Sequence, residues 1–115
     1  AVSQLPTWAR IERLSGDMYF AWTKGQPESC ASIAKQLSKE LDKAPKPNGP
    51  EQDSTLLGAY TSIGNAGECL AKAGRCAEGK KLARESLKRR GDMRALAEPA
   101  YTERWEKAYP ACKGK

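Results

Sequence analysis

The chain has 115 residues, of which 39% are hydrophobic and 30% charged, with a formal net charge of +6 and no histidine. This length fits one domain over residues 1–115, and the composition is too apolar for a disordered chain. No uncharged run reaches the roughly 20 apolar residues that a membrane-spanning helix needs.

Apolar residues recur at helical spacing in the first half of the chain. Pro6 suits the first turn of a helix, and residues 25–27 break the chain before a second helix. Residues 44–50 contain three prolines and a glycine and must form a loop. The apolar stripes of the two helices are Leu5, Trp8, Ile11, Met18 and Trp22, then Cys30, Ile33, Ala34, Leu37 and Leu41.

The second half predicts three more helices. Asp53 or Ser54 is a good N-cap for a third helix that ends at Gly74, and a fourth runs from Cys76 to Gly91. Asp92 can cap a fifth, which Pro99 either kinks or begins and Pro110 ends. Its predicted inward face is Met93, Leu96, Ala100, Tyr101, Trp105 and Ala108. We therefore predict an all-α fold of about five antiparallel helices, as stacked hairpins or a bundle.

Four cysteines in a short chain favour two disulfides, with three possible pairings. The alternatives are free thiols in a cytosolic protein and a four-thiolate zinc site. Zinc knuckles bring ligands in close pairs, whereas six residues separate the nearest pair, Cys69 and Cys76. Successive antiparallel helices would place Cys30, Cys69, Cys76 and Cys112 at the same end of the bundle, which supports disulfides. The spacing of the cysteines leads us to expect no metal site.

Residues 60–91 resemble one tetratricopeptide repeat, a helical hairpin of about 34 residues. The turns at Gly25 and Gly74 are 49 residues apart, and Cys76 replaces the aromatic residue expected after the turn. The matching positions are Gly67, Leu70, Gly74, Gly79, Ala83 and Ser86, and the small ones let two helices approach closely.

The register of this resemblance implies a disulfide pairing. It points Cys69 toward the preceding helix, where Cys30 lies, and leaves Cys76 to pair with Cys112. Each bridge would close a loop of about 36 to 39 residues and stabilise the fold by about 3–4 kcal/mol.

The chain lacks the residues of common catalytic sites. Without histidine it has no ordinary general base near neutral pH, no imidazole metal ligand and no Ser-His or Cys-His pair. Its carboxylates stand among lysines and arginines at helical spacing, which is typical of solvated ion-pairing faces. We therefore expect no enzyme and no cofactor.

The excess of positive charge is confined to the second half of the chain. Residues 1–58 hold 7 basic and 7 acidic side chains, whereas residues 59–115 hold 13 basic and 7 acidic, giving +6. Such a surface attracts anionic partners, or it is a solvated face that aids solubility. The predicted basic face is Lys80, Lys81, Arg84, Lys88, Arg89 and Arg90, in which the first, third and fourth residues recur every four positions.

Aromatic residues offer a second candidate site. Residues 18–22 are apolar all around a helix, so one side of this segment could remain exposed and bind a partner. Core packing is the usual role of such residues, and the alternative is an apolar interhelical pocket. That pocket would be lined by Trp22, Tyr60, Tyr101 and Trp105.

These observations favour a non-enzymatic protein-binding or adaptor module of a periplasmic or secreted protein. The N-terminus lacks the layout of a signal peptide, so the signal of such a protein would lie outside this chain. The expected partner is a protein or another anionic macromolecule and not a nucleic acid, and the oligomeric state is open. The alternatives are a small-molecule or lipid carrier and a secreted effector or inhibitor.

Overall fold

The computed structural model describes residues 6–92, 94–95 and 98–115, and these contain helices and no β-strand. The predicted all-α fold with two disulfides is confirmed. The α-helices are α1 (Thr7–Thr23), α2 (Pro27–Lys43), α3 (Pro50–Lys72), α4 (Cys76–Arg89) and α6 (Pro99–Ala108), followed by a 3-10 turn, η2 (Pro110–Cys112).

Glycines end the helices where the sequence predicts turns. Gly74 follows α3 with φ +84°, a left-handed conformation that costs glycine little. The backbone N–H of Arg75 then donates to the carbonyl of Leu70 at 2.9 Å, and that of Gly74 to Ala71 at 3.0 Å. This pattern satisfies the last carbonyls of the helix and turns the chain back. Gly25 ends α1 in the same way.

Prolines begin three helices, and this corrects one boundary. The predicted N-cap at Asp53 or Ser54 is wrong, because α3 already begins at Pro50. Proline suits the first helical position since its φ is preset and its missing N–H would have no partner there. Pro99 begins α6, which settles the choice between a kink and a start. The predicted core positions Leu5, Met93 and Leu96 lie outside the described residues.

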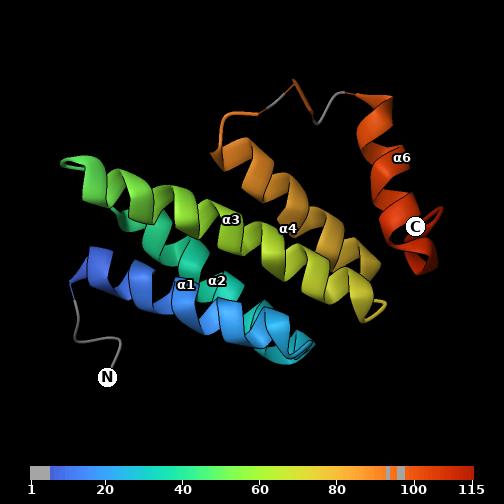
Figure 1. The fold of residues 1–115 in the computed structure, drawn as a ribbon, viewed down its shortest axis with the longest axis horizontal. Helices are drawn as coiled ribbons and strands as arrows, with labels where there is room; N and C mark the ends of the chain where they lie inside the picture. Colours follow the sequence, from blue (N-terminus) through green and yellow to red (C-terminus); the bar gives the residue numbers. More distant parts are fainter. Residues whose placement is uncertain (1–5, 93, 96–97) are drawn as a thin grey trace.

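Helices α1, α2 and α3 enclose most of the core (Figure 1). One cluster joins the start of α1 to the end of α2, and the second joins the end of α1 to the start of α2, so these helices run in opposite directions. The buried members are Ile11, Leu14, Leu37, Leu41, Ala59 and Ile63 in the first cluster, and Met18, Ala21, Cys30, Ala34, Ala66 and Cys69 in the second.

Helix α4 packs against α3 through small residues. A Cβ atom on Gly67 would lie 2.7 Å from the carbonyl oxygen of Gly79 and 2.9 Å from the backbone nitrogen of Ala83. A Cβ atom on Gly79 would lie 2.7 Å from the carbonyl oxygen of Gly67. Both distances are well inside van der Waals contact, so the two backbones touch directly. The expected close approach at these small residues is confirmed.

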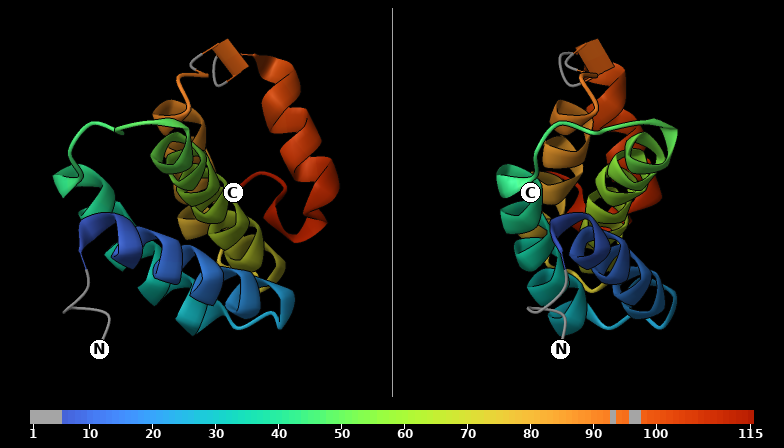
Figure 2. Two further views of the ribbon diagram at one scale, coloured as in Figure 1. Left: turned by 60° about the vertical axis from the view of Figure 1, so that its left-hand side comes forward. Right: turned by 90° about the vertical axis from the view of Figure 1, so that its left-hand side faces the viewer.

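The C-terminal helix α6 lies beside α3 and α4, away from α1 (Figure 2). A small cluster attaches it, in which the Trp105 ring packs near Ala83 and Cys76, with Tyr109 at a ring-centroid distance of 4.6 Å. The bridge from Cys76 to Cys112 joins the start of α4 to η2.

Both predicted disulfides form. Cys30 pairs with Cys69 at a Cα–Cα distance of 6.6 Å, and Cys76 pairs with Cys112 at 5.3 Å. Arg75 also bonds to Glu28 at 2.7 Å, which links the start of α2 to the turn before α4. The two disulfides and this ion pair therefore gather at one end of the helices.

The glycine contact predicts opposite effects for two substitutions in α3. Gly67→Ala gains helix propensity but forces the α3 and α4 backbones apart, and we expect the free energy of unfolding to fall by about 1–3 kcal/mol. Gly58→Ala is the matched control, because its Cβ meets nothing within 4 Å, and it should stabilise the fold by about 0.5–1 kcal/mol. Urea unfolding of both variants measures this difference. Equal effects at the two positions would contradict the close approach.

Candidate functional site

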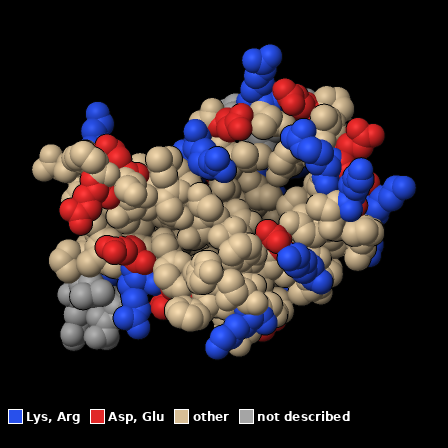
Figure 3. Space-filling view, viewed as in Figure 1, with Lys and Arg blue, Asp and Glu red and all other residues tan. Residues whose placement is uncertain are grey.

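Four of the six predicted basic residues form the available positive surface on α4 and the residue that follows it. Lys81, Arg84, Lys88 and Arg90 are exposed, and none of them makes an ion pair or side-chain hydrogen bond within the described residues. Most Lys and Arg side chains on the face seen in Figure 3 lie on its right-hand part, with some acidic side chains among them. These cations are therefore free to meet an anion from solvent.

Arg89 does not belong to this surface, although its neighbours in the sequence do. Its guanidinium bonds to Asp42 on α2 at 2.8 Å and to Glu85 at 3.0 Å, and it also donates to the carbonyl of Ser38. Burial opposes its charge, but the two carboxylates outweigh burial and raise the pKa of Arg89. The side chain ties α4 to α2 and is not available to a partner.

Lys80 is partly engaged as well. It is half-buried, and its ammonium group donates to the backbone carbonyl of Lys115 at 2.6 Å. In the predicted row of Lys80, Arg84 and Lys88, only Arg84 and Lys88 are therefore without a partner among the described residues.

The four aromatic residues proposed for an apolar pocket do not meet. Trp22 packs against the core cluster at the end of α1, Tyr60 against the cluster at its start, and Trp105 belongs to the cluster under α6. Tyr101 lies on α6, where burial raises its pKa and the charges of Arg84 and Arg104 oppose that shift. Core packing accounts for Trp22, Tyr60 and Trp105.

An aromatic patch is exposed at the end of α1. Tyr19 and Phe20 are 58% and 64% exposed, while Met18 and Ala21 are buried. The Tyr19 ring packs edge-on against both Phe20 and Trp22, with centroids 6.3 Å and 5.9 Å away. The expectation that one side of residues 18–22 remains exposed is confirmed.

A groove between α2 and α4 was not anticipated from the sequence. It has a volume of about 400 Å³, and its apolar part consists of alanines and leucines from three helices. Polar contacts join its two sides: Arg75 bonds to Glu28 near one end, and Arg89 bonds to Asp42 near the other. Between them, Ser38 donates to Glu85. The lining residues are Ala31, Ala34, Lys35, Ser38, Lys39, Asp42, Leu70, Glu78, Lys81, Leu82 and Glu85.

The sequence carries a faint signal of this groove. Lys35 and Lys39 are four residues apart and so lie on the same side of α2, beside Ala31 and Ser38. Nothing in the sequence shows that α4 lies opposite them.

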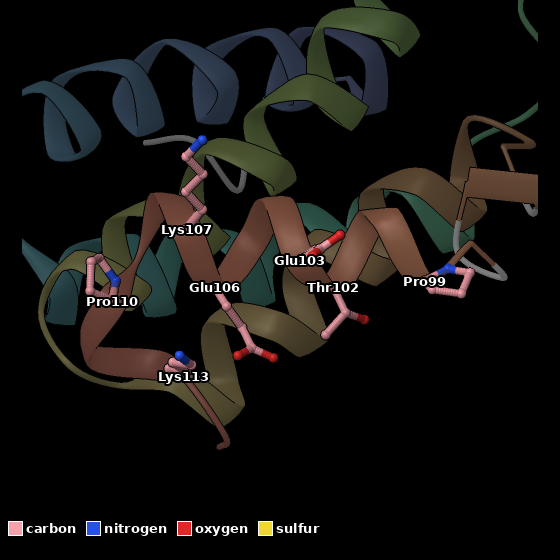
Figure 4. A pocket seen from close by; sticks show the side chains of 7 residues that line it. All are labelled: Pro99, Thr102, Glu103, Glu106, Lys107, Pro110 and Lys113. Carbon is pink, nitrogen blue, oxygen red and sulfur yellow. The ribbon is translucent and has the colours of Figure 1, made fainter.

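A larger hollow of about 970 Å³ on α6 and η2 does not form a focused site. Its side chains carry both charges, and Lys107 points to the opposite side of α6 from Glu106 (Figure 4). These groups do not converge on one point, so they fit neither catalysis nor selective binding.

Metal sites and membrane-spanning helices were also searched for in the described residues. There, no group of three or more acidic or cysteine side chains could hold a metal ion. No described helix is long and apolar enough to cross a bilayer.

Comparison with protein-family models, curated proteins and solved structures finds no significant match to this chain. The resemblance of residues 60–91 to a tetratricopeptide hairpin therefore stays a prediction, and the site must be interpreted from its own geometry.

The two neighbours Lys88 and Arg89 should respond differently to truncation. Arg89→Ala removes contacts with two carboxylates and a carbonyl, and we expect the free energy of unfolding to fall by about 1–2 kcal/mol. Lys88→Ala removes an exposed cation and should change it by less than about 0.5 kcal/mol. Urea midpoints of the two variants give the comparison. Similar losses of unfolding free energy in the two variants would mean that the ion pairs of Arg89 do not stabilise the fold.

Proposed function

We propose that this chain is a non-catalytic protein-binding module of an exported protein, and that its α4 surface meets an acidic surface of the partner. One observation carries the proposal: Lys81, Arg84, Lys88 and Arg90 are exposed on one helix or just beyond it, and no described acidic residue neutralises them. Unpaired surface charges of one sign steer a partner of opposite charge and speed its association.

The two disulfides support an oxidising compartment, such as the periplasm or the extracellular space. Nucleic acid is not the expected polyanion there, whereas acidic protein surfaces are common. The exposed aromatic pair Tyr19 and Phe20 is a further feature of protein-binding surfaces, since large exposed apolar side chains often mark contact sites.

The proposal predicts a charge-dependent loss of binding. The double variant Arg84→Glu/Lys88→Glu should bind poly-L-glutamate at least about ten-fold more weakly than the parent, with a shallower dependence on salt. Lys24→Glu/Lys46→Glu is the matched control, because it makes the same charge change at exposed lysines far from α4 in the sequence. Isothermal titration at several salt concentrations measures both.

Two results would overturn this function. Equal losses in both double variants would mean that net charge alone attracts the polymer. Tight binding of heparin with none of poly-L-glutamate would point to an anionic glycan in place of an acidic protein.

The compartment has its own test. Intact mass spectrometry of natively purified protein, without reductant, should give a mass about 4 Da below the reduced value, because two disulfides remove four hydrogen atoms. An alkylating reagent should add nothing until the protein is reduced. Four labelled thiols would place the protein in a reducing compartment and contradict export.

A further inference from the structure

In the groove between α2 and α4, the acidic side chains have ionic partners among the described residues and the lysines do not. Its lining includes three lysines and three carboxylates, so its formal charge is zero. The carboxylates, however, already have partners: Arg75 bonds to Glu78, and Arg89 bonds to Glu85 and Asp42. None of the three lysines makes an ion pair or side-chain hydrogen bond within the described residues: Lys35, Lys39 and Lys81.

Two of the three carboxylates each accept two hydrogen bonds. Glu78 accepts two hydrogen bonds from Arg75, each 2.8 Å long, and these bonds lower its pKa. Glu85 accepts from both Ser38 and Arg89. These bonds occupy the acidic side chains, so the charge left for a ligand in this groove is positive.

The same groove offers apolar surface between its lysines. Ala31 and Ala34 come from α2, Leu70 from α3 and Leu82 from α4. A ligand that fits both features carries carboxylates and at least one apolar group. A purely ionic polymer would leave the apolar surface unused, and a neutral apolar molecule would leave the lysines without partners.

The shape of the groove favours a short extended segment. Its lining on α2 runs from Ala31 to Asp42, a length of about 16 Å at 1.5 Å per residue. About five extended residues span that distance. Ion pairs from Arg75 to Glu28 and from Arg89 to Asp42 join the two sides of the groove near the two ends of this stretch. The lysines of the groove are exposed, so the groove is open to solvent. A pocket for a lipid tail would instead enclose most of its ligand.

We propose that the groove between α2 and α4 binds a short, extended, acidic peptide segment. An apolar side chain of the peptide packs on Ala31 and Leu82, and flanking carboxylates meet Lys35, Lys39 and Lys81. This site differs from the outer surface of α4 and draws two of its lysines from the half of the chain with zero net charge. The two sites share Lys81, and Lys35 and Lys39 distinguish the groove from the binding surface at Arg84 and Lys88.

The test uses a fluorescein-labelled heptapeptide with four glutamates around a central leucine. Fluorescence anisotropy should show saturable binding that weakens at least about ten-fold in Lys35→Gln/Lys39→Gln. The matched control, Lys24→Gln/Lys46→Gln, makes the same charge change at exposed lysines outside the groove and should bind like the parent. All four positions are exposed, so circular dichroism should show unchanged helix content in both variants.

Two altered probes separate the contributions of charge and apolar contact. Replacing the central leucine of the peptide by serine, or its glutamates by glutamines, should each reduce affinity at least about five-fold. In ¹⁵N-labelled protein the peptide should shift the amide signals of Ala31, Ser38 and Leu82. The variant Arg84→Glu/Lys88→Glu should still bind the heptapeptide through Lys35 and Lys39, which separates this site from the proposed α4 function.

Several outcomes would overturn the groove proposal. Equal affinity of the peptide for the Lys35/Lys39 variant and for its control would show that these lysines do not contribute to binding. Amide shifts confined to other helices would place the peptide elsewhere. If dodecanoate shifts the groove amides and the heptapeptide does not, the ligand is an acyl carboxylate and the peptide assignment is wrong.

Discussion

The direct contact between the α3 and α4 backbones at Gly67 and Gly79 sets the orientation of α4. With no side chain between them, the two backbones are in direct contact, and Ser86 adds to this contact by donating to the carbonyl of Tyr60 at 2.6 Å. Each residue of a helix is turned by about 100° from the last. Once one side of α4 is fixed on α3, Glu85 must face α2, and Arg84 faces solvent.

Most of the fold follows from local rules in the sequence. Helical apolar spacing and turn glycines placed four helices, and the register of the tetratricopeptide resemblance implied the cysteine pairing. The error at Asp53 arose because two start signals competed, and Pro50 acts earlier in the chain. Leu57 is 59% exposed because apolar residues at 56, 57, 59 and 60 span more of the helix than the core can cover.

The candidate sites were only partly predictable. A cluster of charged residues can be seen in the sequence, but the ion pairs that they form depend on residues far away in the chain. The cluster of cations on α4 is visible in the sequence. The ion pair with Asp42 that removes Arg89 from this cluster is not, since the two residues are 47 positions apart. The groove is harder still to foresee. Lys35 and Lys39 lie in a half of the chain with no net charge, and their availability emerges only when the acidic side chains around them are seen to be occupied.

The positions of the two disulfides affect how the chain would respond to proteolysis. The proline-rich connection at residues 44–49 lies within the loop closed by Cys30 and Cys69. The connection between α4 and α6 lies within the loop closed by Cys76 and Cys112. Exposed connections are where proteases cut first. A single cut in either one would leave both pieces joined by a disulfide, so a nicked molecule would keep its covalent integrity and release no fragment.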